Sequence, residues 1–432
     1  MPSPRYLDLL ARLGAAQALG VELGLEPVRR ALALLGNPQK QFAAVQIAGT
    51  NGKGSTAAMA EAILRAAGYR TGLYTSPHLA RFTERIRVSG CEIDGNRLAA
   101  LDRQVVATGV PLTYFEIATV LGFLALAEEA VEIAVLETGL GGRLDAVTAA
   151  EPLGTAITSI GIDHTGYLGG TLRAIAREKA GILKPGVVCF LGRLPVEAED
   201  EIAGIATEVG APLARLGRDF QAAVGPLGLA GPHQRDNAAI ATALAGAAAA
   251  GLGRALDPQT VGRALAGAVW PGRLERLGDD LLLDCAHNAE GAAALAAALP
   301  ELAGGRRVAL LISIARDKDP EAIFAALAPV ASAVVATRSE SLRALPPDAL
   351  AMQARRFFAE VAAHDDVTEA LGAARHLAGP GGLVVVCGSM FLVGTLRARL
   401  LGEPVDALPT ADPVSGVGSG PAGDGAATSL RR

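Results

Sequence analysis

The residues Gly49-Thr50-Asn51-Gly52-Lys53-Gly54-Ser55-Thr56 decide the fold class of this chain of 432 residues. They follow an apolar run at 43–48 and precede an alanine-rich segment of helical length that extends to residue 67. This order of strand, glycine loop and helix is typical of a phosphate-binding loop. Glycines let backbone N–H groups point at phosphate oxygens, and the helix N-terminus adds the positive end of its dipole. Lys53 would add a positive charge; the alternative is a plain glycine turn in which Ser55 or Thr56 caps the helix.

Apolar runs separated by glycine-rich turns and helical segments continue along the chain, which predicts an α/β fold. A P-loop-type, mostly parallel sheet domain is predicted from strands at 43–48, 133–137, 155–159 and 187–191 and helices at 56–67, 115–129 and 171–180. A smaller Rossmann-like α/β domain is predicted from strands at 281–285, 308–313, 333–337 and 383–388. The carboxyl ends of parallel strands form one edge of a sheet, so the polar clusters that follow them should converge there.

Proline and glycine in Val269-Trp270-Pro271-Gly272-Arg273 stop a helix and suit a connection between domains. We therefore place a first domain at 1–272 and a second at 273–401. Residues 402–432 are rich in Gly, Pro, Ala and Ser and have no hydrophobic period, which predicts a disordered tail.

Composition and charge narrow the class of protein. Half of the residues are hydrophobic and 19% are charged, which is typical of a globular protein. The net charge of −5 provides no general field for nucleic acid or anionic membranes. The four cysteines form no C-x-x-C pair, the first residues do not read as a leader, and the alanine-rich window 238–253 is too short and too weakly apolar for a membrane span. We expect a cytoplasmic monomer with neither nucleic acid nor membrane as a partner.

Seven further motifs follow the loop along the chain. They are LYTSPHLARFTERI (73–86), LETGLGGRLDA (136–146), SIGIDHTGYLG (159–169), AREKAGILKPG (176–186), HQRDNA (233–238), WPGRLE (270–275) and LLDCAHNAEGA (282–292). With the loop, they make the chain resemble the folylpolyglutamate synthase/dihydrofolate synthase family of the Mur ligase superfamily from about residue 20 to residue 400. The set of motifs also distinguishes this folate branch from the cell-wall ligases.

The resemblance implies an ATP-dependent ligase. Such an enzyme joins L-glutamate to dihydropteroate, to (poly)glutamylated tetrahydrofolate, or to both through an acyl phosphate, and releases ADP and phosphate. Two alternatives stay open: a Mur-type ligase for another carboxylate acceptor, and a nucleotide-binding regulator that has lost catalysis. Lost catalysis is disfavoured by the joint presence of Lys53, Glu137, His164, Lys179, Arg273 and Asp284.

Two Mg²⁺ ions are implied as cofactors beside ATP. Glu137 ends an apolar run, where its carboxylate suits a metal ion; the alternative is a solvated glutamate at a strand end. The resemblance assigns Ser76 and Glu137 to one ion and His164 to the other, although His164 could instead be a loop histidine bonded to Asp163. It also assigns to the second ion a carbamate formed from the Lys179 amine and carbon dioxide; the alternative is a solvated lysine at a helix C-terminus. The predicted catalytic residues are thus Lys53, Glu137, His164 and Lys179.

The resemblance also assigns nucleotide contacts. The phosphates would be held by Asn51, Gly52, Lys53, Gly54 and Ser55. Asn237, Arg273 and Asp284 would contact the base, a phosphate and the ribose, respectively. As alternatives, these three are a capping asparagine, an arginine in a surface ion pair and an acid in a turn after a strand.

The folate or dihydropteroate substrate is expected on the first domain, at Leu23, Gly24, Thr113, Tyr114, Phe115, Glu116, Leu144, Asp145 and Ala146. Phe115 could stack on the pterin ring, or it could be a core aromatic. His287 is assigned to the incoming L-glutamate; the alternative is an ordinary polar residue of the loop. The family usually reads LDATN where this chain reads LDAVT at 144–148, so the choice between the two activities stays open.

Overall fold

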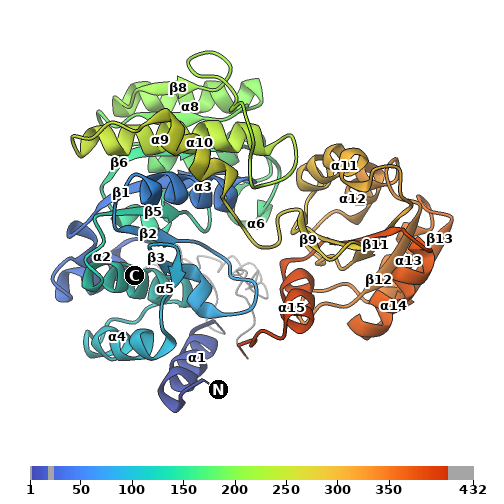
Figure 1. The fold of residues 1–432 in the computed structure, drawn as a ribbon. Coiled ribbons are helices and arrows are strands. Elements are labelled where there is room, and N and C mark those ends of the chain that lie inside the picture. Colours follow the sequence, from blue (N-terminus) through green and yellow to red (C-terminus); the bar gives the residue numbers. More distant parts are fainter. Residues whose placement is uncertain (1, 18–23, 407–432) are drawn as a thin grey trace, which may run out of the picture.

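The computed structural model describes residues 2–17 and 24–406, which form two α/β domains (Figure 1). The first domain holds an eight-stranded sheet in the order β4-β3-β2-β5-β1-β6-β7-β8. Its strands are β1 (Ala43–Ala48), β2 (Thr71–Tyr74), β3 (Ile86–Val88), β4 (Cys91–Glu92), β5 (Ile133–Glu137), β6 (Pro152–Ile157), β7 (Cys189–Leu191) and β8 (Leu213–Arg215). All neighbours from β2 to β8 in this order are parallel, and β3 and β4 extend one edge antiparallel. The predicted mostly parallel sheet is confirmed.

Side chains of the central strands alternate between two apolar cores. Ile133 and Val135 belong to one core, and their neighbours Ala134 and Leu136 belong to the other. The first core is covered by α3 (Lys53–Ala66), α9 (Gln234–Gly251) and α10 (Pro258–Ala266), and the second by α1 (Pro4–Gln17), α2 (Glu26–Leu34), α4 (Gly95–Ala107) and α5 (Tyr114–Glu128) (Figure 1). Because both faces are covered, the strands are apolar at consecutive positions.

A third core lies beyond β6, where α6 (Thr165–Leu168), α7 (Leu172–Lys179) and α8 (Val196–Val209) pack. The alanine-rich window 238–253 lies mostly in α9, and most of its alanines are buried in the core that this helix covers. Among the helices of residues 2–17 and 24–406, none is long and apolar enough to cross a membrane.

The second domain holds a six-stranded sheet in the order β13-β12-β11-β14-β10-β9. Its strands are β9 (Glu275–Leu277), β10 (Leu281–Leu283), β11 (Val308–Ile312), β12 (Ala333–Thr337), β13 (Glu360–His364) and β14 (Leu383–Cys387). Only β9 is antiparallel to its neighbour. Helices cover both faces: α11 (Ala289–Ala303), α12 (Pro320–Leu327), α13 (Pro347–Ala354), α14 (Val367–Ala378) and α15 (Met390–Leu401). The smaller α/β domain is thereby confirmed, and the proposed boundary at residue 272 falls in the segment that joins α10 to β9.

The C-terminal segment ties the second domain to the first. Asp406 accepts hydrogen bonds from the Tyr6 hydroxyl and from the Phe82 N–H, both at 2.7 Å. Glu403 pairs with Arg81 of the first domain at 2.9 Å and with Arg397 of α15 at 2.8 Å. Residues 402–406 of the predicted tail therefore make specific contacts, and 407–432 lie outside the described residues.

Two truncations should separate these contacts from the rest of the tail. Ending the chain after Leu401 should lower the free energy of unfolding by about 1–3 kcal/mol, because it removes several hydrogen bonds to charged groups. Ending it after Asp406 should leave both stability and activity unchanged. Urea unfolding of the two truncated proteins and the full chain makes the comparison, and equal losses in both would show that the contacts of Glu403 and Asp406 contribute nothing.

Candidate active site

A cleft with a cavity volume of about 250 Å³ lies between the two domains. It is lined by the end of β5 and by the loops that follow β1, β6 and β10, with residues of both domains. Every predicted site residue that the structure describes lines it: Gly24, Asn51, Gly52, Lys53, Gly54, Ser55, Ser76, Thr113, Tyr114, Phe115, Glu116, Glu137, Leu144, Asp145, Ala146, His164, Lys179, Asn237, Arg273, Asp284 and His287. Leu23 lies outside the described residues.

The glycine loop is held in place by close contacts to other segments. Gly52 has a φ of 85°, and a Cβ added there would lie 2.6 Å from the Asn237 Oδ1 atom. Gly52 is also the N-cap of α3, which begins at Lys53. The alternative of Ser55 or Thr56 as the helix cap is therefore wrong, and both lie inside the helix. Asn237 lies in the first turn of α9 and not at its cap, so the capping alternative for this residue is wrong as well.

Two lysines, the buried Lys179 and the half-buried Lys53, meet at the glycine loop. Lys53 Nζ donates to the carbonyl oxygens of Gly49 and Thr50 at 3.1 Å each, and Lys179 Nζ donates to the Gly49 oxygen at 2.8 Å. Burial, and then the nearby charge of Lys53, lowers the pKa of Lys179 to about 7. Burial also lowers the pKa of Lys53, although Glu137 and Asp163 oppose this effect. The alternative of a solvated Lys179 is wrong, because its side chain is buried at the end of α7.

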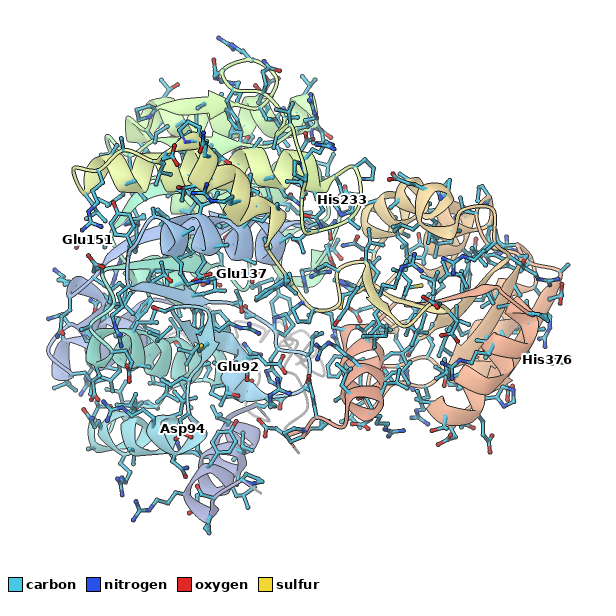
Figure 2. All side chains as sticks on the ribbon, in the orientation of Figure 1. Glu92, Asp94, Glu137, Glu151, His233 and His376 are labelled. Carbon is cyan, nitrogen blue, oxygen red and sulfur yellow. The ribbon has the colours of Figure 1, made fainter. Side chains whose placement is uncertain are left out.

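Glu137 places a carboxylate beside these cations. It comes from the end of β5 and is only 5% exposed, so the alternative of a solvated glutamate is wrong (Figure 2). Its Oε2 atom accepts a hydrogen bond from the Ser76 N–H at 3.3 Å. Burial raises the pKa of Glu137, and the charges of Lys53, Arg273 and Arg85 oppose that shift. A carboxylate in this setting has lone pairs left for a metal ion.

Asp163 joins the two domains across the cleft. It accepts hydrogen bonds from Lys318 and, at 2.9 Å, from Asn288 Nδ2, both in the second domain. Burial raises its pKa, but the interaction with His287, whose Nε2 lies 3.7 Å from Asp163 Oδ2, and the charges of His164 and Lys318 outweigh burial and hold the pKa well below its usual range. His164 lies beside Asp163, with 4.0 Å between His164 Nε2 and Asp163 Oδ1. The alternative of a loop histidine at Asp163 therefore stays open.

Several predicted ligand contacts already have protein partners. Asp284 accepts from the backbone N–H groups of Leu274 at 3.0 Å and Ala286 at 2.9 Å, as an acid in a turn after a strand would. Glu116 accepts from the Thr113 N–H at 2.8 Å and caps α5. Asp145 accepts from two backbone N–H groups, and its burial raises its pKa to about 6. These acids hold the cleft in shape whether or not they also touch a ligand.

The structure also tests the alternatives for Arg273, a surface ion pair, and for Phe115, a core aromatic. No ion pair of Arg273 is present within the described part of the chain, so a surface ion pair is not its role there. Phe115 lines the cleft while also packing against the core, and its ring fills the space over Gly139.

Sequence reasoning missed four charged residues of the cleft: Arg85, Lys318, Arg343 and, as an interdomain partner, Asp163. Arg85 stands in the quoted motif 73–86, but nothing in the motif shows that its side chain is buried. Lys318 and Arg343 belong to segments without a motif, and only the packing of the second domain brings them to the cleft.

Comparisons with known proteins agree with this geometry. Residues 47–188 match the Mur ligase middle domain, and residues 272–390 match the Mur ligase glutamate ligase domain. A Bacillus subtilis protein named dihydrofolate synthase/folylpolyglutamate synthase is 33% identical over 436 residues, which cover 91% of this chain and 99% of that one. The chain spans about half the length of two archaeal relatives, whose names add dihydropteroate synthase.

Two solved structures show the same fold. An Escherichia coli relative, FolC in complex with DHPP and ADP, is 31% identical with a TM-score of 0.85 over 92% of this chain and 98% of that one. A Yersinia pestis bifunctional folylpolyglutamate synthase/dihydrofolate synthase, complexed with AMPPNP and a Mn ion, is 31% identical with a TM-score of 0.80 over 88% and 94%.

Proposed function

The chain belongs to the folylpolyglutamate synthase/dihydrofolate synthase family of Mur ligases, and from this we propose that it is an ATP-dependent ligase of L-glutamate. The acceptor is dihydropteroate, a (poly)glutamylated tetrahydrofolate, or both. The observation that carries the proposal is the cleft between the two domains, where a phosphate loop, the lysines Lys53 and Lys179 and a buried carboxylate come together.

The nucleotide lies along the glycine loop. Asn51, Gly52, Lys53, Gly54 and Ser55 hold the phosphates, since the N-terminus of α3 and the Lys53 ammonium both favour negative charge there. Asn237 takes the base, Arg273 a phosphate and Asp284 the ribose. Arg273 lies in the segment that joins the domains, which lets it respond to their closure.

Magnesium fits the donor set at Glu137. This ion prefers oxygen ligands and keeps several waters, so one or two protein ligands suffice. Glu137 offers a buried carboxylate, and Ser76, whose backbone N–H donates to that carboxylate, carries a hydroxyl. Among the described residues, no three His, Cys, Asp or Glu side chains are grouped closely enough to form a metal cage. When bound, the ions would neutralise negative charge on the transferred phosphoryl group; Ser76 and Glu137 would hold one, and His164 and Lys179 the other.

A carbamate on Lys179 suits this position. The amine is buried next to a second cation, Lys53, so a neutral or negative form is favoured over a second ammonium. Only a neutral amine adds carbon dioxide, and the product is an oxygen anion at the end of the same side chain. This change would turn a repelled cation into a ligand for the second ion.

The substrates approach from the two domains. Gly24, Thr113, Tyr114, Phe115, Glu116, Leu144, Asp145, Ala146 and, outside the described residues, Leu23 surround the pterin-bearing substrate. L-Glutamate carries two carboxylates, and the second domain offers His287, Lys318 and Arg343 at the cleft to receive them. The amine of glutamate then faces the acceptor held by the first domain.

The reaction has two steps. A carboxylate oxygen of the acceptor attacks the γ-phosphorus of ATP, the bond to the bridging oxygen breaks, and ADP leaves. The glutamate amine attacks the carbonyl carbon of the acyl phosphate, phosphate departs with the former carboxylate oxygen, and the amine loses a proton. Charge stabilisation rather than acid–base chemistry dominates the first step, which suits a cleft rich in buried cations.

Glutamate-dependent ADP release with a panel of acceptors tests the proposed function. Release that requires both L-glutamate and a pteroate or folate supports it. Release only with a different carboxylate acceptor would make the chain another Mur-type ligase, and binding without release would make it a regulator. The cytoplasmic location and the monomeric state stay predictions.

Glu137→Gln should lower kcat about 100-fold, because the amide keeps the shape but loses the charge that supports phosphoryl transfer. Binding of dihydropteroate, measured by calorimetry, should change by less than about threefold, since acceptor contacts lie elsewhere. Glu151→Gln, at an exposed surface pair, is the matched control. Equal losses in rate and acceptor binding would show a structural role for Glu137.

A further inference from the structure

The floor of the cleft contains a buried arginine without an acidic partner. Arg85 is 1% exposed and lines the cleft, yet among the residues that the structure describes it makes no ion pair. Its Nε atom donates to His78 Nδ1 at 2.9 Å. Its Nη2 atom is buried and has no hydrogen-bond partner. A buried guanidinium that lacks a counter-charge is costly unless a ligand supplies one.

The acids nearest to Arg85 in sequence are committed elsewhere. Glu84 accepts hydrogen bonds from the backbone of its own loop, at Leu79, Ala80 and Arg81. Glu92 pairs with Arg81 and accepts from Thr83. The position of Arg85 is nevertheless fixed: its guanidinium lies 5.8 Å from the centre of the Phe82 ring and 5.4 Å from that of the Tyr114 ring.

Two more donors without a partner surround this guanidinium. The Tyr114 hydroxyl is buried, lines the cleft and has no hydrogen-bond partner. His78 accepts from Arg85 through Nδ1, so its proton is on Nε2, which is also buried and unpartnered. The Arg85 guanidinium and the Tyr114 hydroxyl line the cleft and can donate hydrogen bonds there, and Arg85 carries a full positive charge. This combination fits a ligand that accepts hydrogen bonds and carries negative charge.

The location of Arg85 indicates which anion of the reaction it binds, the acceptor carboxylate or the ATP phosphates. The backbone oxygen of Arg85 accepts from the Thr75 N–H at 2.9 Å, which places it beside Ser76, and its charge acts on Glu137. Tyr114 and Phe115, expected at the acceptor, are on the same side of the cleft, whereas the glycine loop has its own cations. Resting on the proposed function, we propose that Arg85 binds the acceptor carboxylate that is to be phosphorylated and orients it toward the γ-phosphorus.

Dihydropteroate tests this proposal well because it has a single carboxylate. Its carboxamide has nearly the same shape, no charge and an N–H₂ donor that would face Arg85. Wild-type protein should bind dihydropteroate about 10- to 100-fold more tightly than the carboxamide in calorimetry, as expected for a lost hydrogen bond to a charged group. Equal binding of the two would overturn the proposal without any variant.

The variant Arg85→Met should lose this discrimination and bind both compounds with similar, weak affinity. Arg85→Lys, which keeps the charge but not the planar fork, should keep part of it. Arg375→Met, at an ion pair with Asp280 in which both side chains are about half exposed, is the matched control and should behave as wild type. All proteins should bind AMPPNP equally, which also shows that each is folded.

Two results would overturn the role of Arg85. Discrimination by Arg85→Met as strong as that of wild type would mean that another group reads the carboxylate. Loss of AMPPNP binding in Arg85→Lys would place Arg85 at the nucleotide instead. A failure of the proposed function itself looks different, because wild-type protein would then bind neither dihydropteroate nor its carboxamide.

Discussion

Lys53→Ala is expected to lower ATP turnover about 10³-fold or more, because its ammonium is the charge closest to the predicted phosphates in the glycine loop. The ammonium is also held by two loop carbonyls, so its loss removes both a charge and a support of the loop. The measurement is glutamate-dependent ADP release at saturating ATP, together with calorimetric binding of AMPPNP.

Lys40→Ala is the control for this substitution, because Lys40 makes only an exposed pair with Glu151. The fold of Lys53→Ala should stay intact, since the side chain is not part of an apolar core. Normal turnover in a folded Lys53→Ala protein would show that the loop does not bind the transferred phosphoryl group.

Lys179→Ala should be nearly as damaging, with a loss of about 10³-fold in kcat, if a carbamate on this amine completes the second ion site. A short added carboxylate, such as formate or acetate, should recover part of the rate by replacing the missing anion in the space left by the side chain. Removal of bicarbonate should slow the wild-type protein and leave the rescued variant unaffected. Lys184→Ala, five residues along and outside the cleft, is the matched control.

The adduct itself can be observed. Native mass spectrometry should detect one added CO₂ in the wild-type protein and none in Lys179→Ala. A crystal structure with substrates bound and a bare Lys179 ammonium paired to a phosphate would contradict the carbamate, and the ions would then depend on Glu137, His164 and water.

Strands can be predicted accurately from the sequence where they are apolar throughout. The strands β1, β5 and β12 begin and end at their predicted residues, because an apolar run that is buried on both faces has sharp polar borders. The strands β2, β3, β4, β8, β9 and β13 were not predicted. Strands such as β4 and β8 have only two or three residues, which is too short to show an apolar run. The strand β13 lies at a sheet edge, and most of its side chains are only half-buried, so it shows no apolar run either.

The start of α3 shows a different limit. The helix was predicted from Thr56, but it begins at Lys53, because Gly52 takes up the left-handed conformation at the cap. The β6 strand spans Pro152–Ile157 rather than 155–159, since the chain turns toward the cleft after Ile157.

Motifs can identify the residues of this site, but they do not predict how buried those residues are or what they contact. The motifs indicated most of the polar residues that converge at the cleft, but burial is a property of tertiary packing. The 5% exposure of Lys179 and Glu137, the contact of Asp163 with Lys318 across 155 positions, and the missing partner of Arg85 all depend on segments far apart in sequence. This burial and these contacts shift the pKa values of Lys179, Glu137 and Asp163.

Transfer of a labelled oxygen tests the central claim most directly. Dihydropteroate carrying ¹⁸O in its carboxylate would be incubated with the protein, ATP and unlabelled L-glutamate, and the released phosphate would be analysed by mass spectrometry. If the chain forms an acyl phosphate and ligates glutamate to it, each phosphate released with product carries one ¹⁸O atom. Phosphate without label, in the presence of product, would contradict the proposed mechanism.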